Sequence, residues 1–312
     1  MLEIRRLRLL RELAARRTIA AVAKALSFSP SAVSQQLAQL EREVGVPLLE
    51  RAGRGVRLTD AARTLVEHTE QLLARMDQAE ADLARASGQV RGTLRVATFE
   101  TAGIALLPPA LHMLAQVHPD LEIEVVQSDP EESMAALVAG DLDVVISDEY
   151  EGDPRPHQLA LNRQDLCVDP LRLVLPRDDP LVEHGRPVAL SALADRPWAI
   201  GPVGHSDGDF VVRMCRELGG FDPIVRHRAS NLLILLEVVR SRRAVSILPD
   251  LLGADRHAGV AVRPIAERAL HRSIFTAVRR GSERRPNVVA VREALSGALE
   301  SSPKVLQTAK GS

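Results

Sequence analysis

Residues 20–49 read AAVAKALSFSPSAVSQQLAQLEREVGVPLL, and this stretch decides the fold of the N-terminal part of the chain. Its apolar residues recur at helical spacing in two segments, 18–26 and 30–43. In the turn between them, Ser29 is suited to cap the second segment and Pro30 to occupy its first helical position. Two helices joined by so short a turn predict a helix-turn-helix motif.

The second of these helices carries side chains suited to reading DNA. Glutamine can address adenine and serine can address several base edges, and both types gather at its N-terminal end. The basic turn RAGRGVR (51–57) then resembles a wing whose arginines contact phosphates or the minor groove. The alternatives are an ordinary capped surface helix and, for either wing arginine singly, a solvated turn residue. The predicted DNA-binding residues are Ser29, Pro30, Ser31, Ser34, Gln35, Gln36, Arg54 and Arg57.

The charge of the chain is unevenly distributed. Residues 1–60 hold eleven basic and six acidic side chains, which gives them a net charge of +5. The whole chain has a net charge of −1, so the remaining residues carry −6. A basic N-terminal region on a mildly acidic body favours a polyanionic partner for that region.

Composition excludes several other classes. A chain of 312 residues that is 46% hydrophobic and 26% charged is typical of soluble globular proteins with more than one domain. No apolar run approaches the roughly 18–20 residues of a spanning helix, and no unbroken apolar segment follows the N-terminal arginines. The two cysteines, Cys167 and Cys215, form no disulfide or zinc pattern. We therefore expect a cytoplasmic protein with reduced thiols, no membrane association, no metal and no cofactor.

Residues 60–88 predict one long helix, because Thr59 can cap it and neither Gly nor Pro interrupts it before Gly88. Apolar or small residues recur at alternating spacings of three and four, at positions 62, 65, 69, 72, 76, 79, 83 and 86. This heptad pattern favours self-association, although a helix packed on its own core is the alternative. The predicted dimerisation residues are Leu65, Leu72, Met76 and Leu83.

After a hinge expected at 88–92, short apolar runs alternate with helical segments, which predicts α/β architecture built on mostly parallel sheets. A single helix is expected over 104–117. The predicted domains are a DNA-binding domain (1–59), a linker helix (60–88) and a body (89–312). Within the body, we expect subdomain I at about 93–162 and 269–302, and subdomain II at about 163–268.

The segment 20–49, the following ERAGRGVRLTDAA (50–62) and GTLRVA at 92–97 together resemble LysR-type transcriptional regulators over the whole chain. Arg17 departs from the small or Gly residue common before the second helix, and Ala62 from a frequent Gly after the wing. The resemblance implies a winged helix-turn-helix, a long linker helix and an effector domain of two subdomains like type II periplasmic-binding proteins. It also implies a sequence-specific regulator at the nucleoid, a homodimer or homotetramer on promoter DNA, and contact with RNA polymerase.

Two other functions remain open at this point. Gly204-His-Ser-Asp-Gly208 matches the G-x-S-x-G pattern of hydrolases, with Ser206 as nucleophile and acids and histidines following in hydrolase order. So short a motif arises often by chance. The second alternative is a structural DNA-bending protein without any effector. We favour a regulator that is not an enzyme and that binds a small effector between its subdomains.

The effector is expected outside the carboxyl ends of the strands, near helix N-termini. Thr98 and Thr101 match a hydroxyl-bearing turn that members of the resembled family use to hold effectors. Acids on the same turns, such as Glu100 and Asp207, would repel a simple anion, so a zwitterion or a polar neutral molecule is favoured. Helix capping is the alternative role for each hydroxyl. The predicted effector-binding residues are Thr98, Thr101, Ser128, Ser147, Asp148, Gly201, Ser206 and Asn231.

Overall fold

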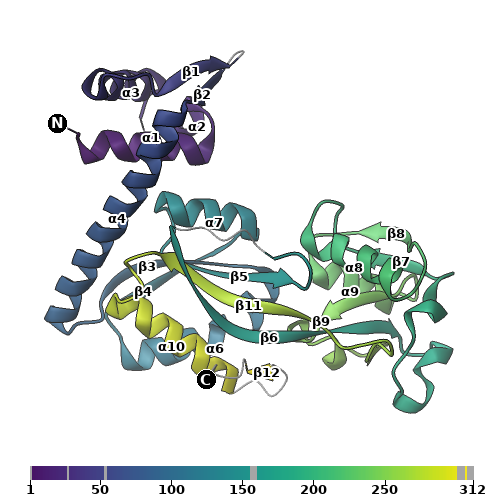
Figure 1. Cartoon of the computed structure of the whole chain (residues 1–312). Coiled ribbons are helices and arrows are strands. Elements are labelled where there is room, and N and C mark those ends of the chain that lie inside the picture. Colours follow the sequence, from purple (N-terminus) through teal and green to yellow (C-terminus); the bar gives the residue numbers. More distant parts are fainter. Residues whose placement is uncertain (1, 27, 53–54, 155–159, 301–305, 308–312) are drawn as a thin grey trace.

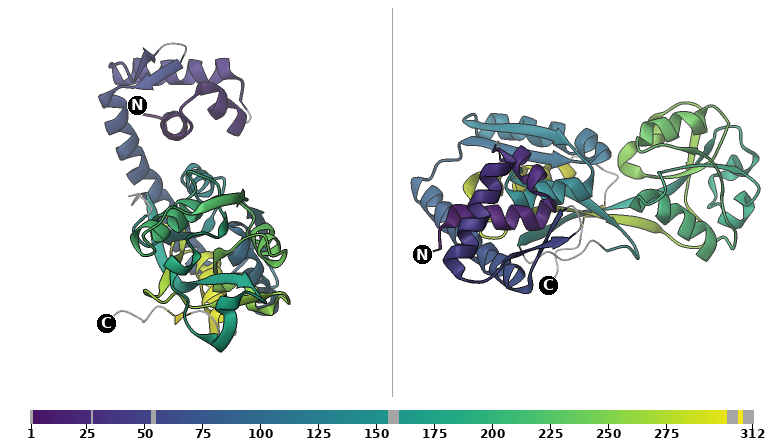
Figure 2. Two further views of the ribbon diagram at one scale, coloured as in Figure 1. Left: turned by 90° about the vertical axis from the view of Figure 1, so that its right-hand side faces the viewer. Right: turned by 90° about the horizontal axis from the view of Figure 1, so that it is seen from above.

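The computed structural model describes residues 2–26, 28–52, 55–154, 160–300 and 306–307. Figure 1 shows three parts in chain order: a small head, a long helix that leaves it, and a larger body with two lobes. Seen from above, the two lobes lie side by side and the head lies over one of them (Figure 2, right). Among the described helices, not one combines the length and the apolar character that a membrane crossing requires.

The head is a three-helix unit followed by a two-stranded antiparallel hairpin. Leu10, Val33 and Leu40 belong to its hydrophobic core and are almost completely buried. The carboxylate of Glu41 accepts hydrogen bonds from the backbone N–H groups of Leu48 (2.8 Å) and Leu49 (3.0 Å), which ties the third helix to the hairpin. The elements are α1 (Ile4–Arg16), α2 (Ile19–Ala25), α3 (Pro30–Val44), β1 (Leu49–Ala52) and β2 (Gly55–Leu58).

The linker is a single helix, α4 (Asp60–Ser87), as the sequence predicts. The Thr59 hydroxyl accepts from the backbone N–H of Ala62, and Gly88 ends the helix in the left-handed conformation (φ 65°). Subdomain I of the body begins shortly afterwards with a strand at Gly92.

The prediction of mostly parallel sheets is wrong for the body. In the described part of the chain, its main sheet has eight strands in the order β10-β6-β11-β5-β3-β4, with β9 and β12 also paired to β6. Only β4, β3 and β5 run parallel to one another, whereas β11 is antiparallel to β5 and β6, and β6 is antiparallel to β9, β10 and β12. The strands are β3 (Gly92–Thr98), β4 (Leu121–Gln127), β5 (Val144–Tyr150), β6 (Leu161–Pro176), β9 (Ser246–Pro249), β10 (Val260–Arg263), β11 (Leu270–Arg279) and β12 (Leu306–Gln307).

The reason for the antiparallel pairs is the connection between the lobes. The chain enters subdomain II along the 16-residue strand β6 and returns along β11, so these two long strands lie side by side in opposite directions (Figure 1). Subdomain II adds a small parallel sheet of β7 (Pro197–Ile200) and β8 (Ile224–Arg228). Each lobe has its own hydrophobic core, in which α6 and α10 contribute to subdomain I and α8 and α9 to subdomain II.

The helix expected over 104–117 is two helices. Pro108 and Pro109 lack the N–H groups that would bond to the carbonyls of residues 104 and 105, so a continuous helix cannot pass this point. The helices of the body are α5 (Glu100–Ala105), α6 (Leu107–Val117), α7 (Pro130–Ala139), α8 (Ser206–Glu217), α9 (Leu232–Arg240) and α10 (Pro286–Glu300). Short 3-10 turns occupy Pro180–Gly185, Leu190–Leu193, Asp250–Leu252 and Ala254–Arg256.

Candidate DNA-binding surface and effector cleft

The N-terminal end of α3 is exposed and its serines are ordered by local bonds. The Ser29 hydroxyl accepts from the backbone N–H of Ala32 (3.2 Å) and lies 3.0 Å from the Ser31 hydroxyl, and Ser34 donates to the carbonyl of Pro30 (2.9 Å). Ser31, Ser34 and Gln35 all face solvent. This end of the helix can therefore enter a groove without displacing other parts of the chain.

Two other predicted DNA-binding residues already have partners within the head. Gln36 is partly buried, and its side-chain oxygen accepts from Arg6 Nε (3.1 Å) on α1. Arg57 on β2 forms an exposed ion pair with Glu50 on β1 (2.6 Å), and such a surface pair is weak enough for a phosphate to displace. Arg54 lies outside the described residues.

Arg17 ends α1 in the left-handed conformation, with φ 66°. A β-carbon is strained in this region, which glycine occupies freely. The backbone therefore explains why a small residue or Gly is common here in the resembled family. The departure at Arg17 therefore concerns backbone strain, and it has no evident link to base recognition.

The linker helix contacts the head and the body on different parts of its surface. Near its start, Ala62 and Leu65 pack into the core of the head. Further along, Asp77 accepts from Arg279 (3.3 Å) and Arg285 (3.0 Å), at the end of β11 and before α10. A β-carbon at Gly281 would overlap the carbonyl of Ala74, so this close approach requires glycine.

The predicted dimerisation residues fall into two groups, one packed within the protomer and one exposed. Leu65 belongs to the core of its own head, so at this position packing within the protomer accounts for the pattern. Leu72, Met76 and Leu83 are 49%, 40% and 73% exposed and extend from the middle of the helix towards its end. A row of exposed large apolar side chains on one helix is typical of an interface.

The head also contacts subdomain I directly. Arg11 on α1 donates to the carbonyl of Ala139 at the end of α7 (2.8 Å), and Arg16 forms an ion pair with Asp141. Glu12, which is almost fully buried, pairs with both of these arginines. The position of the head is thus linked to the end of a helix whose first turn borders the cleft described next.

A cleft of about 690 Å³ opens between the two subdomains. Subdomain I contributes the start of α5, the loop before α7 and the end of β5, and subdomain II contributes the first turns of α8 and α9. This placement follows the rule that ligands of open α/β sheets bind at strand ends beside helix N-termini. The lining residues are Phe99, Glu100, Thr101, Gln127, Ser128, Asp129, Pro130, Glu132, Asp148, Tyr150, Gly204, His205, Ser206, Asp207, Ser230, Asn231, Leu232 and Arg272.

Arg272 on β11 is 2% exposed and lies against two carboxylates. Its Nη1 donates to Asp148 (3.0 Å), its Nε and Nη2 donate to Asp169 (3.0 and 2.7 Å), and Nη2 also donates to the Thr101 hydroxyl (2.6 Å). Burial alone would lower the pKa of Arg272, but the charges of Asp169 and Asp148 raise it above its ordinary value. Sequence reasoning missed Arg272, because nothing in its strand pattern distinguishes it from its neighbours.

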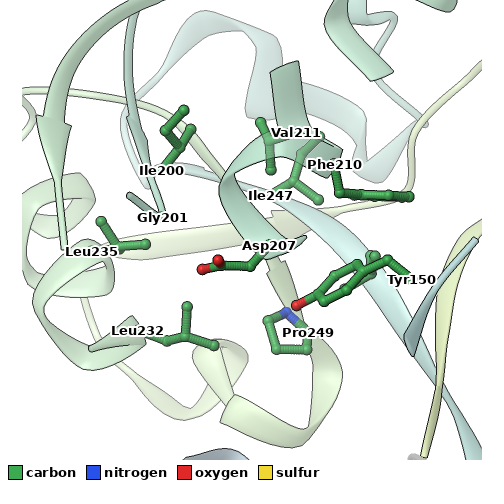
Figure 3. Close-up of a pocket in the computed structure, with 11 residues that line it drawn as sticks. Tyr150, Ile200, Gly201, Asp207, Phe210, Val211, Leu232, Leu235, Ile247 and Pro249 are labelled. Carbon is green, nitrogen blue, oxygen red and sulfur yellow. The ribbon is translucent and has the colours of Figure 1, made fainter. Parts of the chain in front are cut away.

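Asp207 lies where the cleft narrows into a small apolar pocket of about 10 Å³, room for about one water molecule. Figure 3 shows its carboxylate and the Tyr150 side chain pointing inward among Gly201, Leu232 and Pro249. Burial raises the pKa of the Asp207 carboxyl, although its own backbone N–H and that of Gly208 donate to it. A β-carbon at Gly201 would overlap this carboxylate, so Gly201 makes room for it.

The structure brings most of the predicted effector-binding residues together. Thr101, Ser128, Asp148, Ser206 and Asn231 line the cleft, and Gly201 lines the adjoining small pocket. Their contact with an effector stays a prediction.

Two predicted effector-binding residues lie elsewhere. Thr98 is buried outside the lining and donates to the carbonyl of Phe99 (3.1 Å). Ser147 is fully buried outside it, because alternate side chains of β5 point to opposite faces of the sheet.

Neither cysteine is exposed to the cleft. Cys167 belongs to the core of subdomain I and Cys215 to that of subdomain II, and both are free thiols. Burial raises the pKa of each thiol to about 12. At neutral pH both are therefore protonated and poorly nucleophilic.

A helix-turn-helix head, a helix with an exposed apolar row and a two-lobed ligand cleft together define the class of ligand-responsive DNA-binding regulators. Comparison with known proteins gives the family. The model of the bacterial regulatory helix-turn-helix protein, lysR family, matches residues 4–63, and that of the LysR substrate binding domain matches residues 87–300. The chain belongs to the LysR family of transcriptional regulators.

The relatives include full-length regulators. The hydrogen peroxide-inducible genes activator of Pectobacterium carotovorum is 28% identical over 309 residues, covering 97% of this chain and 100% of that one. A full-length OxyR variant from Pseudomonas aeruginosa matches in structure with a TM-score of 0.70 at 22% identity, covering 100% of this chain and 99% of that one. CbnR in complex with its target DNA matches with a TM-score of 0.56 at 24% identity, covering 95% and 100%.

Family membership confirms the predicted fold class and the function of a DNA-binding transcriptional regulator with an effector domain. The helix-turn-helix model places DNA binding in residues 4–63. Because the relatives are regulators, the hydrolase interpretation of Ser206 is wrong. The serine begins α8 and faces the effector cleft.

Proposed function

We propose that the exposed N-terminal end of α3 reads promoter DNA, with Ser31, Ser34 and Gln35 at the base edges and Arg54 and Arg57 on the backbone of the duplex. The observation that supports this assignment is the solvent-facing position of the three α3 side chains, which are short enough to approach base edges closely. In this proposal, residues 1–59 bind DNA, 60–88 connect and dimerise, and 89–312 sense the effector.

A second copy of the same chain covers the exposed apolar row of the linker helix in this proposal. Leu72, Met76 and Leu83 would lie opposite the same residues of the partner, or offset along the seam in an antiparallel pair. A pair of heads then binds two half-sites, and the second contact benefits from the high effective concentration that the first creates. Two such dimers would form the tetramer, and we propose that it recruits RNA polymerase at the nucleoid.

The cleft between the subdomains holds the effector in this proposal, and non-covalent binding is the signal. The relative from Pectobacterium carotovorum is by its name an activator of hydrogen peroxide-inducible genes, but the thiols of this chain are buried and protonated. The link from the cleft to DNA runs through α7, whose first turn borders the cleft and whose end contacts Arg11 and Arg16 of the head. Ligand binding that shifts α7 would therefore change the position of the head.

Selection of DNA from a random library by the full-length protein tests the proposal. We expect enrichment of an interrupted palindrome, bound by a dimer or tetramer. Fluorescence anisotropy on that DNA, with and without candidate effectors, then measures the coupling. Enrichment of bent but sequence-unrelated DNA, with no small molecule changing its affinity, would favour the structural DNA-bending alternative.

A further inference from the structure

The cleft is strongly acidic for a site that binds a metabolite. Its lining holds five carboxylates against one guanidinium and one imidazole. The carboxylates belong to Glu100, Asp129, Glu132, Asp148 and Asp207. Charges of one sign in a confined cleft concentrate ligands of the opposite sign.

The one arginine of the lining is already engaged. Three of its nitrogens donate to Asp148, Asp169 and the Thr101 hydroxyl, at distances of 2.6–3.0 Å. An anionic ligand would have to displace one of these carboxylates and leave it buried without a partner, which is costly. Arg272 therefore neutralises the floor of the cleft and leaves no free positive charge for a ligand carboxylate.

Glu100 lacks a donor on one of its oxygens. Its Oε2 accepts from the backbone N–H of Leu232 across the cleft (2.9 Å), so it joins subdomain I to the start of α9 in subdomain II. Its Oε1 is buried and has no hydrogen-bond partner among the described residues. Buried carboxylate oxygens are nearly always bonded, so this one points to a donor that is supplied from outside the chain.

Asp207, in the other subdomain, is a second carboxylate of the lining, and among the described residues the imidazole of His205 is the opposite charge that acts on it. It accepts only from backbone N–H groups at the start of its own helix, and no Lys or Arg among the described residues pairs with it. The small pocket beside it is lined mostly by apolar side chains, among them Phe210, Leu232 and Leu235. That pocket has room for about one water molecule, so an alkyl chain would have to lie in the main cleft of about 690 Å³, with its cationic group beside Asp207.

We infer that the effector is a small alkylamine without a carboxylate, such as a diamine, whose protonated amines bind the carboxylates of Glu100 and Asp207 between the subdomains. The inference rests on the proposed role of the cleft as the effector site. It departs from the zwitterionic or polar neutral effector expected from the sequence, because Arg272 is occupied and cannot hold a ligand carboxylate. Exposed Asp129 and Glu132 at the rim provide a place for a second cationic group.

The test is calorimetry on the full-length protein with ligands matched in length and opposite in charge. Putrescine is compared with succinate and cadaverine with glutarate. L-lysine and L-arginine, which combine a side-chain cation with a carboxylate, should bind more weakly than the diamines. We expect at least one diamine to bind and neither dicarboxylate to do so. Glu100→Gln and Asp207→Asn should each weaken that binding at least tenfold, because each replaces a carboxylate by a neutral amide. Asp222→Asn, at an exposed acid paired with Arg216 outside the cleft, should not.

Thermal unfolding of each variant shows whether it is folded. Binding of a dicarboxylate without either diamine, or no binding of either diamine, would overturn the inference. So would amine binding that survives both cleft substitutions. DNA binding by the same samples is measured in parallel, so that a wrong effector class is distinguished from a protein that is not a regulator of the proposed kind.

Discussion

Arg272 on β11 and Asp169 on β6 are direct cross-strand partners, and their side chains form a buried ion pair of 2.7 Å. They lie on the two strands that join the subdomains, and the same guanidinium reaches Asp148 on β5 and Thr101 on α5. One side chain thus connects the strands that link the lobes to the floor of the cleft. We expect any opening or closing of the cleft to occur around this fixed point.

Arg272→Met should destabilise the body strongly, by about 3–5 kcal/mol, because it leaves two buried carboxylates without their cation. The single tryptophan, Trp198, is buried in subdomain II, and its fluorescence during urea unfolding measures the change. The control is Arg216→Met, which removes an exposed pair and should cost less than about 1 kcal/mol. Equal effects of the two substitutions would contradict a structural role for the Arg272 cluster.

Gln35→Ala should relax sequence preference at one base pair of the selected operator, with a loss of about 1–3 kcal/mol there. Arg57→Ala should instead weaken binding to all DNA sequences alike. The slope of log K against log salt concentration should fall by about one, because one phosphate contact is lost. Anisotropy titrations over a series of salt concentrations and single-base operator variants separate the two effects. Gln116→Ala, on the body helix α6, is the matched control. Unchanged operator preference in Gln35→Ala would mean that α3 is not the recognition helix.

Leu72→Asp or Met76→Asp should dissociate the assembly, because each places a charge in an apolar contact and its desolvation is unfavourable. Light scattering measures the mass, and operator affinity should fall with it. Val203→Asp introduces the same charge at an exposed loop residue and should leave the mass unchanged. If the linker variants keep the native mass, the dimer contact lies elsewhere.

Arg17→Gly should stabilise the head by about 0.5–1 kcal/mol, since glycine relieves the strain of the left-handed conformation and this gain exceeds its larger entropy in the unfolded chain. Arg8→Gly, at an exposed position inside α1, should instead lower the free energy of unfolding by about 1 kcal/mol. Urea unfolding of the two variants, followed by circular dichroism, provides the comparison. A destabilised Arg17→Gly would show that the arginine side chain contributes more than its backbone costs.

The thiols of Cys167 and Cys215 should react with Ellman's reagent much more slowly in the native protein than in the urea-unfolded protein, because burial raises the pKa of each to about 12. Hydrogen peroxide at concentrations that oxidise an exposed thiol should leave operator binding unchanged. Cys215→Ser should respond to the effector as the native chain does. A peroxide-dependent change in DNA binding that this substitution abolishes would establish thiol sensing instead.

Local features of the sequence were sufficient for the head and the linker. Caps such as Ser29 and Thr59, the proline that opens α3 and the helical spacing of apolar residues act within a few positions of one another, so they can be read without a structure. The motifs of residues 20–62 also identified the family correctly. Most cleft positions were predictable as well, because strand ends and helix starts are local features and the alternation of elements brings them to one edge.

Tertiary structure decided what depends on contacts between distant segments. Whether β11 pairs with β5 and β6 in parallel or antiparallel fashion follows from the out-and-back path between the lobes, which no local pattern encodes. Long-range packing also places Leu65 of the heptad seam against the core of its own head. It likewise brings Arg6 of α1 to the side chain of Gln36 on α3. Arg272 contacts residues 103, 124 and 171 positions away, so its neutralising role in the cleft exists only in the folded chain. Local sequence was enough for the family and for the helices of the head and the linker, whereas the charge that an effector meets depends on long-range packing.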